Sequence, residues 1–297
     1  MTSTSRGSQS KATNDIDFSE VKERSRLTKE EWREYTKTVW QIANVTCPEH
    51  PAVFPIEIPR RLIKLFTYWG DMVLDPFAGV GTTARAALEC GRRVVCVDQS
   101  LQYVRLMEDE VASRNGDIHH ANIVEGDARN LEFIENDSVD LIVTSPPYWN
   151  KANYGESPLN LGQIDCYTDF LKEMEPAIAE LYRVLRPGRK ICIVTANVNQ
   201  HTNHGLLTFP LATDYANILR TIGFVMINEI IWCKDGTGGR WGSWGAQRPI
   251  FGSYPYPPNL LFKNVHEYIL VFAKPGTTAK TGRTVKNYEY LMGYSET

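Results

Sequence analysis

A rigid turn that can accept hydrogen bonds follows an apolar run in the middle of the chain. Residues 139–144 lead into Ser145, Pro146, Pro147 and Tyr148, and neither proline has an N–H to donate. The turn therefore offers the Ser145 hydroxyl and the Pro146 carbonyl as acceptors. That set suits an aromatic amine, because accepting hydrogen bonds from its N–H groups raises the electron density on the nitrogen. The tyrosine ring can stack on the base and so fix the line along which the nitrogen attacks a methyl carbon. The alternative is a Pro-Pro turn whose tyrosine only packs.

A glycine-containing turn earlier in the chain could bind a ligand at the start of a helix. Asp75 ends an apolar run, and Gly79 and Gly81 then allow a tight turn with bare backbone close to a ligand. The turn lacks the Gly-Lys-Ser/Thr ending of a phosphate loop, and the charge of Asp75 would repel pyrophosphate, which favours a cationic ligand. The predicted contacts are Asp75, Phe77, Ala78, Gly79, Gly81, Thr82 and Thr83.

Two further acids end the next strands. Asp98 lies 23 positions after Asp75, where a carboxylate can accept both hydroxyls of a ribose, although a helix cap beside Ser100 is the alternative. Asp127 could accept from an adenine amino group, or be an ordinary turn aspartate. With their neighbours Gln99 and Ala128, these acids describe a pocket for an adenosine that bears no phosphate.

The elements that position these residues alternate between strands and helices. The strands are predicted at 71–75, 93–98, 122–125, 139–144 and 190–195. The helices are predicted at 27–43, 56–68, 82–90, 100–114, 168–186 and 210–222. Because each strand is apolar on both faces, we expect a parallel sheet covered by helices. Two last strands, 224–233 and 266–274, have no helical pattern between them and should pair antiparallel.

Composition excludes several classes of protein. The 297 residues contain 42% hydrophobic residues and carry a net charge of −3, and no apolar run approaches the length of a membrane span. The polar N-terminus lacks a secretory signal, so a cytoplasmic protein without membrane contact is expected. Six scattered cysteines indicate small buried side chains, and no metal site is expected. We expect a disordered tail at 1–18, one catalytic domain at 19–274, and a second tail at 275–297.

Two motifs together resemble a known family. DPFAGVGTT (75–83) and TSPPYWN (144–150) are similar to the cofactor loop and catalytic motif of S-adenosylmethionine-dependent DNA methyltransferases that modify exocyclic amines. The resemblance covers roughly 27–274, and it implies that His50 and Pro51 touch the methionine end of the cofactor. It also implies a Rossmann-like class I α/β fold: a seven-stranded, mostly parallel sheet with an antiparallel last strand and helices on both faces.

The form of the catalytic motif bears on the substrate. The SPPY form is more usual for cytosine N4 than for adenine N6, so the first expectation is N4 methylation of a cytosine flipped out of duplex DNA. Adenine N6 is the close alternative. Methylation of RNA bases or of a glutamine side chain, and a DNA-binding protein without catalysis, are more distant ones.

One segment is a candidate for DNA contact. Residues 236–265 contain no Asp or Glu, although the chain as a whole is acidic. The predicted DNA-binding residues in it are Arg240, Trp241, Trp244 and Arg248, and a lid over the cofactor or a dimer contact is the alternative. Duplex DNA is the expected partner. A cognate restriction endonuclease and a second copy of the chain are left open.

Overall fold

The core of the protein is one eight-stranded sheet. The structure, a computed structural model, describes residues 17–45, 47, 53–113, 120–151, 157, 159–234, 256 and 264–276. The strand order is β1-β9-β10-β6-β5-β2-β3-β4. The strands are β1 (Val39–Gln41), β2 (Met72–Asp75), β3 (Arg93–Asp98), β4 (Ala121–Glu125), β5 (Val139–Thr144), β6 (Leu185–Thr195), β9 (Val225–Cys233) and β10 (His266–Ala273).

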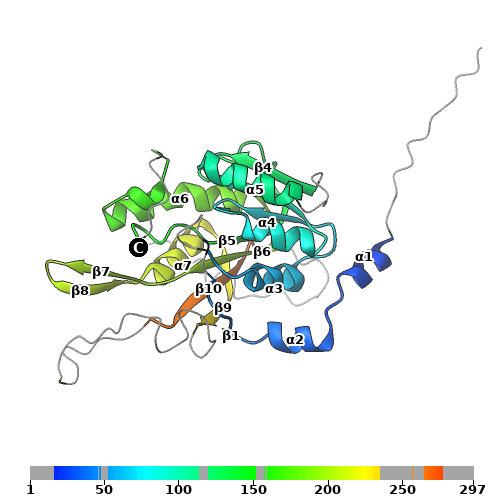
Figure 1. Cartoon of the computed structure of the whole chain (residues 1–297), viewed down its shortest axis with the longest axis horizontal. Helices are drawn as coiled ribbons and strands as arrows, with labels where there is room; N and C mark the ends of the chain where they lie inside the picture. Colours follow the sequence, from blue (N-terminus) through cyan, green and yellow to red (C-terminus); the bar gives the residue numbers. More distant parts are fainter. Residues whose placement is uncertain are drawn as a thin grey trace, which may run out of the picture.

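Helices cover both faces of this sheet (Figure 1). One face packs against α3 (Glu57–Phe66), α4 (Thr82–Glu89) and α5 (Leu101–Ser113). The other packs against α6 (Tyr167–Val184) and α7 (Leu211–Ile222). All six residues of β5 are buried, which is why the central strands read as continuous apolar runs. The Rossmann-like α/β fold expected from the sequence is confirmed, and none of the helices in the described ranges is long and apolar enough to cross a membrane.

The antiparallel strand β10 lies inside the sheet. It pairs antiparallel with β6 on one side and with β9 on the other, as predicted for the last two strands. The other pairings are parallel. Because β10 runs in the opposite direction, its first residues lie at the edge where the parallel strands end.

The N-terminal region differs from the prediction. The helix expected over 27–43 ends early: α2 is Lys29–Tyr35, which begins with a capping box between Thr28 and Glu31. The chain then enters β1, which pairs parallel with β9 and adds an eighth strand to the expected seven. Trp40 is 1% exposed in that strand whereas Trp32 on α2 is 60% exposed, so the two tryptophans do not share the buried face of one helix. Pairing with a strand some 190 positions later overrides local helix propensity.

Two further elements were not expected. A short helix, α1 (Phe18–Arg24), is capped by Asp17 and begins at the last residue of the predicted tail; residues 1–16 lie outside the described part. Strands β7 (Val198–Thr202) and β8 (Gly205–Phe209) form a separate two-stranded hairpin that projects from the body (Figure 1).

Candidate active site

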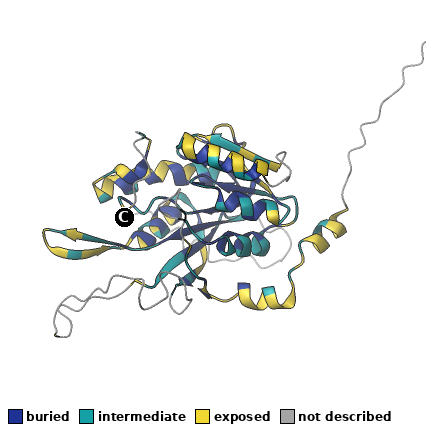
Figure 2. Cartoon of the chain, viewed as in Figure 1, coloured by how far each residue is buried: buried dark blue, intermediate teal, exposed yellow. Residues whose placement is uncertain are grey.

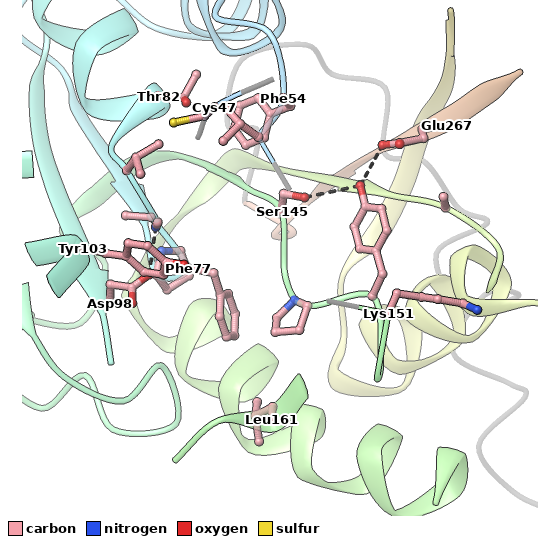
Figure 3. Close-up of a pocket in the computed structure, with 18 of the residues that line it drawn as sticks. Cys47, Phe54, Phe77, Thr82, Asp98, Tyr103, Ser145, Lys151, Leu161 and Glu267 are labelled. Carbon is pink, nitrogen blue, oxygen red and sulfur yellow. Dashed lines mark hydrogen bonds between the residues drawn. The ribbon is translucent and has the colours of Figure 1, made fainter. Parts of the chain in front are cut away.

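The two groups of residues predicted to do chemistry line one cavity. It has a volume of about 680 Å³ and lies at the carboxyl edge of the parallel strands (Figure 3). Among its lining residues, Asp98 lies toward one end and Ser145 toward the other (Figure 3). Gly79 is hydrogen bonded to Asp98, and Tyr148 lies next to Ser145. Parallel sheets bind ligands at this edge because the loops that follow neighbouring strands converge there.

The glycine turn forms the wall at the first end. Phe77, Ala78, Gly79 and Thr82 line the cavity, and the Gly79 N–H donates to Asp98 Oδ2 over 2.8 Å. Gly81 adopts φ +83° at the start of α4, and a Cβ there would lie 2.7 Å from Met107 Cγ. Glycine is therefore required by both conformation and space. Gly81 shapes the turn from behind and is not among the described lining residues.

Asp75, predicted to face the ligand, is instead buried beneath the turn. Its side chain accepts from Thr83 Oγ1 at 2.6 Å, from Thr144 Oγ1 at 2.7 Å and from the Phe77 N–H at 3.1 Å. Burial raises the pKa of this carboxyl to about 6, although these hydrogen bonds favour its charged form. Asp75 and Thr83 thus do not line the cavity. They tie the glycine turn to the end of β5, directly before the turn formed by residues 145–148, which was predicted to be catalytic.

Asp98 is placed to bind a ligand. Its Oδ1 accepts from the Ser100 N–H at 2.9 Å, so it also caps the start of α5, and burial raises its pKa. In the described part of the chain its hydrogen bonds come from backbone N–H groups alone, and each carboxylate oxygen keeps acceptor capacity. Next to it, Gln99 Oε1 is buried without a hydrogen-bond partner among the described residues. The carboxylate fits ribose hydroxyls, and the free amide oxygen fits an N–H donor, so this end is suited to an adenosine.

Asp127 both lines the cavity and pairs with a neighbouring arginine. It lines the cavity together with Ala128, but its carboxylate also accepts from the Arg129 N–H at 2.9 Å and forms an ion pair with the Arg129 guanidinium at 2.8 Å. The turn role considered from the sequence is thus present. The arginine neutralises the charge, which leaves Asp98 as the carboxylate at this end without a basic partner in the described ranges.

The predicted catalytic turn, residues 145–148, is held in place by a contact from α7. Ser145, Pro147 and Tyr148 line the cavity, whereas Pro146 is buried. The Pro147 carbonyl accepts from the hydroxyl of Tyr215 on α7 at 3.1 Å. Because proline fixes φ, this contact leaves the turn little freedom and holds Ser145 at the cavity wall.

Sequence reasoning missed a polar chain behind this turn. The Tyr148 hydroxyl donates to Glu267 Oε2 at 2.8 Å, and the Ser145 hydroxyl lies 3.4 Å from the tyrosine oxygen (Figure 3). Glu267 is also paired with Lys234, and both line the cavity. The available signal was a charged residue, Glu267, inside the apolar strand 266–274. Only the reversed direction of β10 brings it to this edge.

Several predicted site residues lie outside the described part of the chain. These are His50 and Pro51 of the segment before α3, and Arg240, Trp241, Trp244 and Arg248 of the candidate DNA-contacting segment. Cys47, Val53 and Phe54, which flank the first of these segments, do line the cavity.

Comparison with known proteins agrees with the sequence motifs. A family model described as DNA methylase (N6_N4_Mtase) matches residues 5–109 and 139–293. Among curated proteins, the chain is 42% identical over 93 residues to the Type II methyltransferase M.BglI of Bacillus subtilis, covering 31% of this chain and 27% of that one. It is 43% identical over 86 residues to the Type II methyltransferase M.MjaI of Methanocaldococcus jannaschii, covering 26% and 28%. The matches thus span less than a third of either relative.

Among solved structures, the DNA modification methylase TTHA0409 of Thermus thermophilus, complexed with S-adenosyl-L-methionine, is 34% identical. The match covers 55% of this chain and 59% of that one, with a TM-score of 0.39. The cofactor expected from the sequence, S-adenosylmethionine, is confirmed by the family. Since the family model covers most of the chain, including both motifs, the protein belongs to the DNA methylase family of S-adenosylmethionine-dependent methyltransferases.

Proposed function

We propose that the protein methylates the exocyclic N4 amine of a cytosine that is flipped out of duplex DNA, with S-adenosylmethionine as methyl donor. The observation that carries this proposal is the single cavity of about 680 Å³ that joins Asp98 to Ser145 and Tyr148. A volume of this order is typical of sites that enclose a small-molecule ligand. A base within a duplex cannot reach such a cavity, so the target must leave the stack.

The residues of this chain would hold the cofactor at one end. Asp98 accepts from the ribose hydroxyls, Gln99 Oε1 accepts from an N–H group, and Phe77 and Ala78 supply apolar wall. When bound, the cofactor supplies a methyl carbon attached to a positively charged sulfur. The carboxylate of Asp98 adds negative charge to the cavity that receives this cation.

At the other end the turn would activate the amine. Glu267, ion-paired with Lys234, accepts the hydrogen bond of the Tyr148 hydroxyl, so the tyrosine oxygen can in turn accept from the Ser145 hydroxyl. The Ser145 lone pairs then face the cavity and accept an N–H of the amine, which raises electron density on nitrogen. The amine would thus be positioned to accept the methyl group that the cofactor supplies, and the methylated nitrogen, which is acidic, would then give its extra proton to water.

The identity of the product tests the proposal. The purified protein is incubated with duplex DNA and S-adenosylmethionine, and the DNA is digested to nucleosides and analysed by mass spectrometry. We expect N4-methylcytosine. A digest with 6-methyladenine alone would reassign the target base to adenine, because a serine in place of aspartate is all that separates the two motif forms. Duplex DNA that stays unmethylated while RNA or protein accepts the methyl group would overturn the proposal.

Glu267 provides a second test of this mechanism. A Glu267→Gln amide can donate to the tyrosine oxygen, which lets the chain of hydrogen bonds reverse and the Ser145 proton turn into the cavity. We expect kcat to fall roughly 10- to 100-fold, since a hydrogen bond to a charged group contributes about 1.5–3 kcal/mol. The dissociation constant for the cofactor should stay unchanged.

The matched control is Glu229→Gln, an exposed glutamate on the neighbouring strand β9, which should behave as wild type. Adding Tyr148→Phe to the Glu267→Gln protein should cost little more, because both changes break the same chain. Fully additive losses, or an unchanged kcat in the single variant, would show that Glu267 has no part in orienting Ser145.

A further inference from the structure

The hairpin β7–β8 begins at the rim of the active-site cavity. Ala196 lines the cavity, and β7 starts two residues later at Val198. Beyond that point the hairpin leaves the body of the protein as a separate ribbon (Figure 1), and from its second residue onward it is exposed or intermediate in burial (Figure 2). Five residues per strand at about 3.3 Å each give it a reach of about 17 Å. It therefore extends past the place where a flipped base would enter.

The hairpin is fixed to the catalytic turn at its base. The Trp149 ring lies 4.8 Å from the Phe209 ring and 5.1 Å from the Tyr167 ring, and the Trp149 indole N–H donates to the Ile164 carbonyl at 2.7 Å. Trp149 adopts φ +52°, a conformation rare for a large side chain, so these contacts hold it there. Since Trp149 directly follows Tyr148, the hairpin and the catalytic turn are held together.

A second contact joins the same two elements. Lys151 donates to the Asn199 carbonyl, and its Nζ lies 2.8 Å from Gln200 Oε1. Lys151 also lines the cavity. A molecule bound to the hairpin would thus be held at a fixed distance from the cavity.

The chemistry of the hairpin suits nucleic acid. The chain from 187 to 213 contains no Asp or Glu, although the protein as a whole has a net charge of −3. Cross-strand pairing places Asn199 opposite Thr208 and His201 opposite Leu206. With alternating side chains, these four residues share the face opposite to Gln200, and Gln200 is the one that contacts Lys151. Beside Leu206, that face carries an amide, a hydroxyl and an imidazole, with the Thr208 hydroxyl donating to Asn199 Oδ1 at 2.9 Å, and it has no carboxylate that would repel phosphate.

The size and the isolation of the hairpin point to the same partner. In the described part of the chain, β7 and β8 pair only with each other. A lone two-stranded ribbon is marginally stable in water and gains from a surface on which to rest. The major groove of DNA, about 12 Å wide, admits a two-stranded ribbon.

We infer that the β7–β8 hairpin is a DNA-contacting ribbon that enters the major groove next to the target base, with Asn199, His201 and Thr208 facing the duplex. This inference rests on the proposed function, because it takes duplex DNA as the substrate. It assigns DNA contact to an element separate from the 236–265 segment. The hairpin would hold the duplex. The turn at 145–148, which is attached to the foot of the hairpin through Trp149 and Lys151, would receive the flipped nucleobase.

The test uses the full-length protein with His201→Ala and Thr208→Ala combined. Both residues are exposed, so the fold should tolerate the change. The matched control is His120→Ala, an exposed histidine just before β4, at the amino edge of the sheet. Binding to a labelled duplex that the wild type methylates is measured by fluorescence anisotropy, and cofactor binding by calorimetry. We expect DNA affinity to fall at least tenfold in the double variant, with cofactor affinity unchanged and the control like wild type.

Other outcomes separate the two proposals. If the double variant binds and methylates the duplex as the wild type does, the hairpin inference is wrong while DNA methylation stands. If the double variant alters the mass in solution but not DNA affinity, the hairpin is a contact between copies of the chain, and the inference is again overturned. If the wild type itself transfers no methyl group to any duplex, the proposed function fails first.

Discussion

Replacing Ser145 and Tyr148 together by alanine is expected to lower turnover at least about a thousandfold and to leave cofactor binding nearly unchanged. The reason is that Ser145 lies away from Asp98 in the cavity (Figure 3) and Tyr148 lies next to Ser145, so under the proposed function both would meet the amine and not the adenosine. Losing one positioned polar group at a reacting centre typically costs about 100- to 1,000-fold, and losing the stacking ring also removes orientation. Single-turnover kinetics on duplex DNA and calorimetric titration of S-adenosylmethionine measure the two effects.

The control for this variant is Ser157→Ala, which changes a serine outside the cavity lining described above. It should retain wild-type turnover. If instead the alanine pair abolished cofactor binding, the catalytic turn would belong to the cofactor end, and the division of the cavity into two functional ends would be incorrect.

The second large effect is expected from Asp98→Ala, in the affinity for the cofactor. Two hydrogen bonds from ribose hydroxyls to a charged carboxylate contribute about 1.5–3 kcal/mol each, so the dissociation constant should rise roughly 100-fold or more. The substitution also removes the acceptor of the Gly79 N–H, which loosens the glycine turn. Calorimetry with S-adenosylmethionine measures the change. An unchanged dissociation constant would show that Asp98 does not bind the cofactor and serves only to cap α5 through the Ser100 N–H.

The same residue gives a pH dependence whose sign can be stated. Burial raises the pKa of Asp98, so its folded carboxyl takes up a proton at a higher pH than an ordinary aspartate does. The protonated form is the weaker acceptor, and cofactor affinity should fall as the pH drops toward this raised pKa. In Asp98→Asn, which cannot ionise, the affinity should be lower and less dependent on pH over that range.

Individual residues show where sequence reasoning succeeded. The runs around β2, β3 and β5 are apolar on both faces, and burial on both sides is the physical requirement of a central parallel strand. The residues that follow such strands must meet at one edge. For that reason Gly79, Asp98 and Tyr148, although far apart in the chain, line one cavity.

The positions of other residues could not be predicted from the sequence. Asp75 and Asp98 both end apolar strands, and the sequence does not distinguish them. Only the placement of Thr83 and Thr144 around Asp75 makes it an internal anchor while Asp98 faces the cavity. Similarly, β1 and the β7–β8 hairpin have weak local patterns. They exist because of pairing with β9 and packing on Trp149, neither of which lies nearby in the chain.

The α/β class, the order of the main strands and helices, the glycine turn and the proline turn were predictable from the amino-acid sequence. These depend on short-range properties: hydrophobic periodicity, the φ preferences of glycine and proline, and residue spacing. Three features are evident only in the folded protein: which carboxylates face the cavity, the chain of contacts from Tyr148 through Glu267 to Lys234, and the projecting ribbon. Those outcomes depend on strand direction and on contacts between distant segments, which no local pattern encodes.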